Sequence, residues 1–64
     1  MTKTEYFEVI GYRDDKEVLY GKAQDVEKAR AMGSTGLESK SLNYTSVAIF
    51  KVIELRELTG MLNK

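Results

Sequence analysis

Two stretches near the N-terminus alternate apolar and polar residues, the pattern of half-buried β-strands. Residues 5–13 (EYFEVIGYR) are rich in aromatic and β-branched side chains, and residues 17–22 (EVLYGK) follow a polar cluster at 14–16 (DDK). Asp side chains suit a tight turn because they hydrogen-bond nearby backbone groups. The pattern predicts a β-hairpin, in which Gly11 and Gly21 mark a bulge or a close approach of the backbone.

The period changes after the hairpin, where residues 23–33 (AQDVEKARAMG) carry helix signals. Asp25 can cap the first amides, and Glu27 lies in the first turn, where the helix dipole favours negative charge. Arg30 lies near the C-terminal end, and Gly33 can take the left-handed C′ conformation. We expect a helix of about two turns. Its narrow buried face consists of Val26, Ala29 and Met32 or Gly33.

The second half of the chain begins with residues 33–41 (GSTGLESKS), whose Gly, Ser and Thr content predicts a flexible, exposed loop. Residues 42–53 (LNYTSVAIFKVI) have the highest density of β-formers and predict a third strand. From Glu54 onward, apolar residues recur at spacings of three and four, which predicts a short C-terminal helix that is interrupted or ends near Gly60. Continuation of the third strand is the alternative. The spaced residues are Leu55, Leu58, Met61 and Leu62.

These elements predict one small α+β domain over residues 1–64, in β-β-α-β order. A helix that returns the chain lets the third strand lie antiparallel beside the first. The expected fold is a three-stranded antiparallel sheet of order 2-1-3, with one short helix on one face and a short C-terminal helix.

Both faces of this sheet would be apolar, because strand side chains alternate between the two faces. The first strand sends Phe7 and Val9 one way and Tyr6, Ile10 and Tyr12 the other. The third strand sets Val47, Ile49 and Ile53 against Tyr44, Ala48, Phe50 and Val52. One short helix covers only one face. The other must be covered by the C-terminal segment, a second copy or a different protein.

The composition excludes several classes of function. The chain has no Cys and no His, so disulfides, a structural zinc and the usual catalytic nucleophile and proton shuttle are absent. Asp14, Asp15 and Glu17 form a carboxylate cluster, which we interpret as the acidic residues common in hairpin turns and not as a metal site. The glycine-containing loop over 33–41 does not match the phosphate-binding patterns. We therefore expect no enzyme, no metal and no cofactor.

Ten basic and ten acidic side chains give a formal net charge of zero, without the basic footprint of a nucleic-acid binder. Nothing in the sequence resembles a membrane span or a secretory signal, so we expect a cytoplasmic protein.

The arrangement resembles, in style, the small accessory proteins encoded by bacteriophages. Its parts are a Tyr-rich hairpin (EYFEVIGYR-DDK-EVLYG), a short capped helix (DVEKARAMG) and a closing strand (SVAIFKVIEL). Many such proteins bind and inhibit a host enzyme, a defence complex or a toxin. The resemblance implies a binder of a host protein that works in the host cytoplasm.

The leading hypothesis is a non-enzymatic, homodimeric protein-protein interaction module that blocks a partner by occupying its surface. Aromatic anchors and strand edges would supply the contacts. The candidate anchors are Tyr6, Tyr12, Tyr20, Tyr44 and Phe50, with Arg13 and Lys51 at the rim. A nucleic-acid-binding or regulatory module and a structural homo-oligomer subunit are the alternatives.

Overall fold

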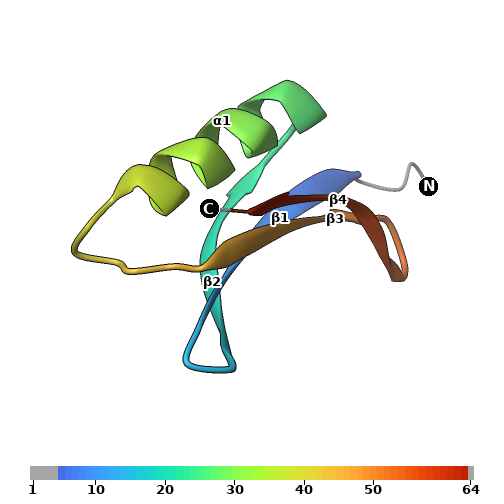
Figure 1. The fold of residues 1–64 in the computed structure, drawn as a ribbon. Coiled ribbons are helices and arrows are strands. Elements are labelled where there is room, and N and C mark those ends of the chain that lie inside the picture. The colour runs from blue at the N-terminus through green and yellow to red at the C-terminus, as the bar shows by residue number, and fades with distance from the viewer. Residues whose placement is uncertain (1–4, 64) are drawn as a thin grey trace.

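The computed structural model describes residues 5–63, which form a four-stranded antiparallel sheet with one helix on one face (Figure 1). The elements are β1 (Tyr6–Arg13), β2 (Lys16–Ala23), α1 (Val26–Glu38), β3 (Ser46–Val52) and β4 (Arg56–Asn63). The strand order is β2-β1-β3-β4. The α+β class, the antiparallel sheet and the 2-1-3 order of its first three strands are confirmed. The three-stranded count is wrong, because the C-terminal segment adds a fourth strand.

The hairpin turn consists of the two residues between β1 and β2. Asp14 and Asp15 have φ values of 52° and 62°, and Arg13 pairs with Lys16 across the turn. A two-residue loop with two left-handed residues has a twist that matches the right-handed twist of the strands, and Asp tolerates that conformation better than most residues. The polar cluster after the first strand therefore closes the hairpin as predicted.

The helix is longer than predicted, because it continues through Gly33 to Glu38. Its start agrees with the sequence: the Lys28 amide donates to the Asp25 carboxylate at 2.8 Å. Gly33 is not a C′ residue, and the predicted flexible loop over 33–41 is wrong for its first six positions. Each helical glycine costs about 1 kcal/mol relative to Ala, so packing against the sheet must offset their weak propensity. The helix residues that the sheet buries are Ala29, Gly33, Gly36 and Leu37.

Small residues on this helix face let the backbone come close to the sheet. A β-carbon at Gly33 would lie 2.9 Å from Leu62 Cδ1 and 3.1 Å from Val47 Cγ1. At Gly36 it would lie 3.5 Å from the Tyr20 ring, an ordinary van der Waals distance. The helix thus rests directly on the centre of the sheet at Gly33 and on a tyrosine ring one turn later.

A second close approach fixes the loop after the helix. The Tyr44 ring covers Gly11, where a β-carbon would lie 2.5 Å from the ring, so the close backbone approach predicted at Gly11 is confirmed. Tyr44 is 2% exposed and meets Tyr20 edge-on, with ring centroids 6.0 Å apart. The next residue anchors the loop, since the Thr45 amide donates to the Tyr12 carbonyl at 2.8 Å.

The C-terminal residues form a strand, so the predicted C-terminal helix is wrong. β3 stops at Val52, short of the predicted 53, and residues 53–55 turn the chain into β4. The pairing of β4 shifts between Phe50↔Leu58 and Ile49↔Gly60, which leaves Thr59 as an extra residue. This β-bulge puts Leu58 and Met61 on one face of the sheet, three residues apart. A bulged strand thereby produced the spacing that we interpreted as helical.

The contrast between the two helical glycines is testable. Gly36→Ala should stabilise the protein by about 0.5–1 kcal/mol, because Ala favours helix and its β-carbon finds ordinary contact distance. Gly33→Ala should destabilise it by about 1 kcal/mol, because Val47 is fully buried and cannot move aside. Urea unfolding of both variants measures the difference. Equal stabilisation by both substitutions would contradict the close packing at Gly33.

Candidate functional site: the open face of the sheet

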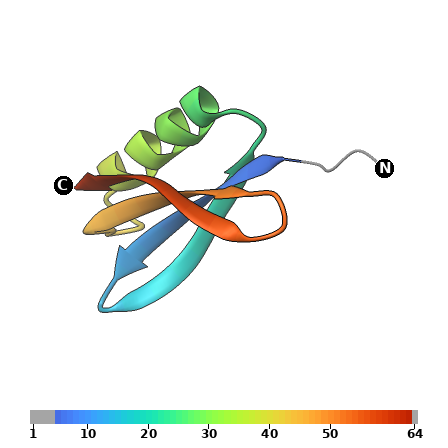
Figure 2. The same ribbon diagram turned by 90° about the vertical axis from the view of Figure 1, so that its right-hand side faces the viewer.

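The sheet face opposite α1 is not covered by any element within residues 5–63 (Figures 1 and 2). We call it the open face. The helix lies over the other face, where Val9, Val47 and Ile49 form the centre of the core at 0–1% exposure. β4 extends the sheet sideways instead of folding across it. The C-terminal segment therefore does not cover the second apolar face, which was one of the three expected covers.

Strand register arranges the open face in rows that cross the sheet. The row at its centre is apolar on all four strands and follows from the pairs Ile10↔Leu19, Ile10↔Ala48 and Ala48↔Met61. We call it the apolar row: Leu19, Ile10, Ala48 and Met61. On one side lies the Tyr12 row: Glu17, Tyr12, Ser46 and Asn63. On the other lies the Phe50 row: Lys22, Glu8, Phe50 and Leu58.

Large side chains of the open face are in contact with solvent. Leu19 is 53% exposed, Leu58 55% and Met61 49%. Ile10 and Ala48, between them, are buried, at 6% and 1% exposure. The bulky residues thus stand on the two edge strands, β2 and β4, around a flat centre. Water at such a surface costs free energy that a second apolar surface would recover.

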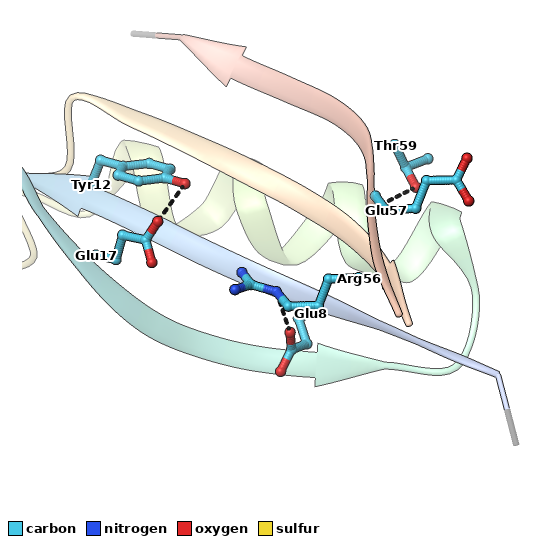
Figure 3. Close-up of polar contacts among 6 residues, drawn as sticks. All are labelled: Glu8, Tyr12, Glu17, Arg56, Glu57 and Thr59. Atoms are coloured by element: carbon cyan, nitrogen blue, oxygen red, sulfur yellow. Dashed lines mark hydrogen bonds and ion pairs between the residues drawn. The ribbon is translucent and has the colours of Figure 1, made fainter. Parts of the chain in front are cut away.

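A polar bridge crosses the face beside the apolar row, between strands that are not sheet neighbours. Arg56 Nε on β4 lies 3.2 Å from Glu8 Oε1 on β1. The two side chains point toward each other in Figure 3. The Arg56 guanidinium lies 4.2 Å from the centroid of the Phe50 ring on the intervening strand. Arg56 therefore satisfies the Glu8 carboxylate and shields part of the Phe50 ring.

Tyr12 and Glu17 make a second polar contact at the other end of the face (Figure 3). The Tyr12 hydroxyl donates to Glu17 Oε1 at 3.3 Å. Burial, and then the charge and hydrogen bond of Glu17, raise the pKa of the Tyr12 phenol above its ordinary 10.0, while Arg56 opposes the shift. The open face therefore has an apolar centre that lies between two polar pairs, Tyr12–Glu17 at one end and Glu8–Arg56 at the other.

The structure divides the candidate anchors between the two sides of the sheet. Tyr12 and Phe50 lie on the open face. Tyr6 pairs with Val52 at the margin of that face, and the centroid of the Tyr6 ring lies 5.3 Å from Lys22 Nζ. Tyr44 is in the core, where its ring covers Gly11, and the half-buried Tyr20 packs against it. Alternation in the third strand was wrongly extended to Tyr44, which precedes β3.

The two candidate rim cations lie on the helix side of the strand alternation. Arg13 donates to the Leu42 carbonyl at 3.1 Å, and Lys51 makes a 3.2 Å ion pair with Glu5. Lys51 pairs with Phe7, which belongs to the core on the helix side. Neither cation therefore contributes to the open face.

Sequence reasoning missed several residues of this surface. Leu58 and Met61 were assigned to a helix, and Leu19 and Arg56 were not singled out. The bulge at Thr59 hid the strand alternation of β4. A second shift, between Val9↔Gly21 and Ile10↔Leu19, leaves Tyr20 as an extra residue in β2 and has the same effect there. The sequence carried no strong strand signal here, because Thr59 is the only β-branched residue between Arg56 and Asn63.

Other features of the described chain are less specific. A wide, open groove of about 830 Å³ lies where β2 leads into α1, and Tyr6, Lys22, Lys28 and Met32 are among its lining residues. Within residues 5–63 there is no group of three acidic, His or Cys side chains placed to hold a metal ion. No helix in this part of the chain is long and apolar enough to cross a membrane.

The Tyr12–Glu17 contact makes a pH-dependent prediction. Because folding raises the phenol pKa, its contribution to stability is complete below pH 10.0 and is lost as pH rises through the higher folded value. Glu17→Gln should move the pKa of Tyr12 down towards its ordinary value, because it removes the neighbouring negative charge. Ultraviolet pH titration, with Tyr12→Phe subtracted to isolate this phenol, measures the shift. An unchanged titration would contradict the coupling, and Glu57→Gln serves as the matched control.

Comparison of the chain with protein-family models, with curated proteins and with solved structures gives no match. The resemblance to small bacteriophage accessory proteins thus stays an expectation drawn from composition and element order. The open face of the sheet is therefore the feature from which a function can be inferred.

Proposed function

We propose that this chain is a non-enzymatic protein-protein interaction module that self-associates through the open face of its sheet. The observation that carries the proposal is the group of half-exposed apolar side chains, Leu19, Leu58 and Met61, on a sheet face that residues 5–63 leave uncovered. Sheets with two apolar faces are normally covered on both, as in sandwiches. A second copy supplies that cover.

The size of the face suits a dimer. Four strands about 4.8 Å apart, each with about seven residues at 3.3 Å, have a footprint of roughly 400 Å². Side-chain relief raises the accessible area above this footprint, so two copies would bury about 1,000 Å² in total. This is near the lower limit for a specific protein-protein interface. We therefore expect a dimer that dissociates in the micromolar range.

Charge also favours a second copy. The chain has zero formal net charge, so two copies do not repel each other as a whole. Charged groups of both signs flank the apolar row, with Glu17 on one side and Lys22 and the Glu8–Arg56 pair on the other. A surface with an apolar centre and flanking groups of both signs can be complementary to itself, as an isologous interface requires.

Charged substitutions on the open face should dissociate the dimer. Met61→Glu and Leu19→Glu should each raise the dimer dissociation constant by 100-fold or more, because each buries an unpaired carboxylate at the interface twice. The wild-type chain should elute as a dimer at tens of micromolar in size-exclusion chromatography with light scattering. Both positions are about half exposed in one copy, so the fold itself should tolerate the change.

Leu55→Glu is the matched control. Leu55 is 82% exposed in the turn between β3 and β4, outside the rows of the open face. This variant should remain dimeric, with circular dichroism spectra that match the other variants. A wild-type chain that is monomeric at 100 µM (roughly 100 times a micromolar dissociation constant), or a Leu55→Glu variant as monomeric as Met61→Glu, would overturn the proposal.

A further inference from the structure

We propose that the two-fold axis of the dimer runs along the apolar row, so that Leu19, Ile10, Ala48 and Met61 each face their own counterparts. This inference rests on the proposed self-association and adds its geometry. In a two-fold interface, both copies use the same patch. The patch must therefore be complementary to a copy of itself that is rotated by 180°. The register of the four strands limits which rotation axes give such a complementary contact.

A half-turn about the apolar row places each strand over its own copy with the direction reversed. Packed sheets keep their strands within about 30° of alignment, so this arrangement is an ordinary sheet-on-sheet contact. Residues of the Tyr12 row then face residues of the Phe50 row of the second copy. The apolar row is the only one of the three rows without a polar side chain, and its exposed ends, Leu19 and Met61, meet their own counterparts while Ile10 and Ala48 are already buried in each copy.

This axis brings opposite charges together on β2. Glu17 belongs to the Tyr12 row and Lys22 to the Phe50 row, and both side chains are exposed. Glu17 of each copy therefore faces Lys22 of the other, and the contact occurs twice. On β1, the same rotation sets Tyr12 opposite Glu8, so the Tyr12–Glu17 pair of one copy lies beside Lys22 and the Glu8–Arg56 pair of the other. Flanking charges of this kind fix register more than they add affinity.

Other in-plane axes place charges on apolar side chains. An axis parallel to the strands would set β2 over β4 and β1 over β3, with Lys22 on Leu58 and Glu8 on Phe50. An axis between the apolar row and the Phe50 row would set Lys22 on Leu19 and Glu8 on Ile10. Both arrangements desolvate the Lys22 ammonium against an apolar side chain, with no carboxylate opposite it. The axis along the apolar row avoids this cost.

Crosslinking through single cysteines tests the axis, because the natural chain has no Cys. In Met61→Cys, the two substituted positions should lie about 10 Å apart across the interface, within reach of a short bismaleimide. In Asn63→Cys, two residues along the same strand, they should be roughly 16 Å apart by the same spacing and rise per residue. We expect efficient covalent dimers from Met61→Cys and at least five-fold less product from Asn63→Cys.

A mixture of Met61→Cys and Leu19→Cys chains distinguishes the axis parallel to the strands. That axis predicts crosslinking between the two different variants and none within Met61→Cys alone. Such a result would overturn the proposed axis while leaving the proposed self-association intact. A wild-type chain that is monomeric in light scattering would overturn both.

Charge exchange on β2 gives an independent test. Glu17→Lys and Lys22→Glu should each weaken the dimer about tenfold, since each creates two like-charge contacts. The double variant should recover to within about threefold of wild type, because the facing charges are exchanged and not lost. Lys16→Glu, on the same strand but on the helix side of the alternation, is the matched control and should leave the dissociation constant unchanged. Additive losses in the double variant would contradict the proposed contact.

Discussion

The contact between the helix backbone and the sheet at Gly33 is the constraint on which the rest of this structure depends. No side chain separates the helix from Val47 and Leu62 at this point, so the helix axis lies close over β3. Ala29 and Gly36 are the small buried residues of the flanking turns, and Leu37 belongs to the same core. A thin layer of this kind lets a very small protein bury the centre of one sheet face with few side chains.

Two tyrosine rings also pack over glycines. Tyr44 covers Gly11 in the sheet, and Tyr20 lies against Gly36 in the helix, while the two rings meet edge-on. Each ring fills space that a side chain would otherwise occupy, and the pair links strand, helix and loop into one cluster. These tyrosines are therefore structural, and the surface available for binding is left to the aliphatic residues of the open face and to Tyr12 and Phe50.

One helix can cover only one face of the sheet. The fourth strand adds further apolar side chains to the face that the helix leaves open. β4 adds Leu58 and Met61 to the open face and Leu62 to the covered one. The Glu8–Arg56 bridge covers part of Phe50 but leaves Leu19 and Met61, at the two ends of the apolar row, in contact with solvent. The proposed self-association along that row would bury Leu19 and Met61 and set Glu17 of each copy opposite Lys22 of the other.

Features that depend only on residues close together in the chain could be predicted from the sequence. The turn at Asp14 and Asp15, the cap at Asp25 and the apolar character of both sheet faces follow from hydrogen bonds and alternation within a few residues. Gly33 looked like a helix end because a glycine with no known neighbour favours that role. Only its position against Val47 shows that it provides space instead.

The sequence by itself determined the hairpin, the start of the helix, the first three strands and the presence of two apolar faces. The tertiary structure decided where the helix ends, that the last segment is a strand, and which aromatic residues are buried. The physical reason is that bulges at Tyr20 and Thr59 change the alternation period, and that glycine contacts depend on partners distant in the chain. Both effects arise from pairing between segments, which no local pattern records.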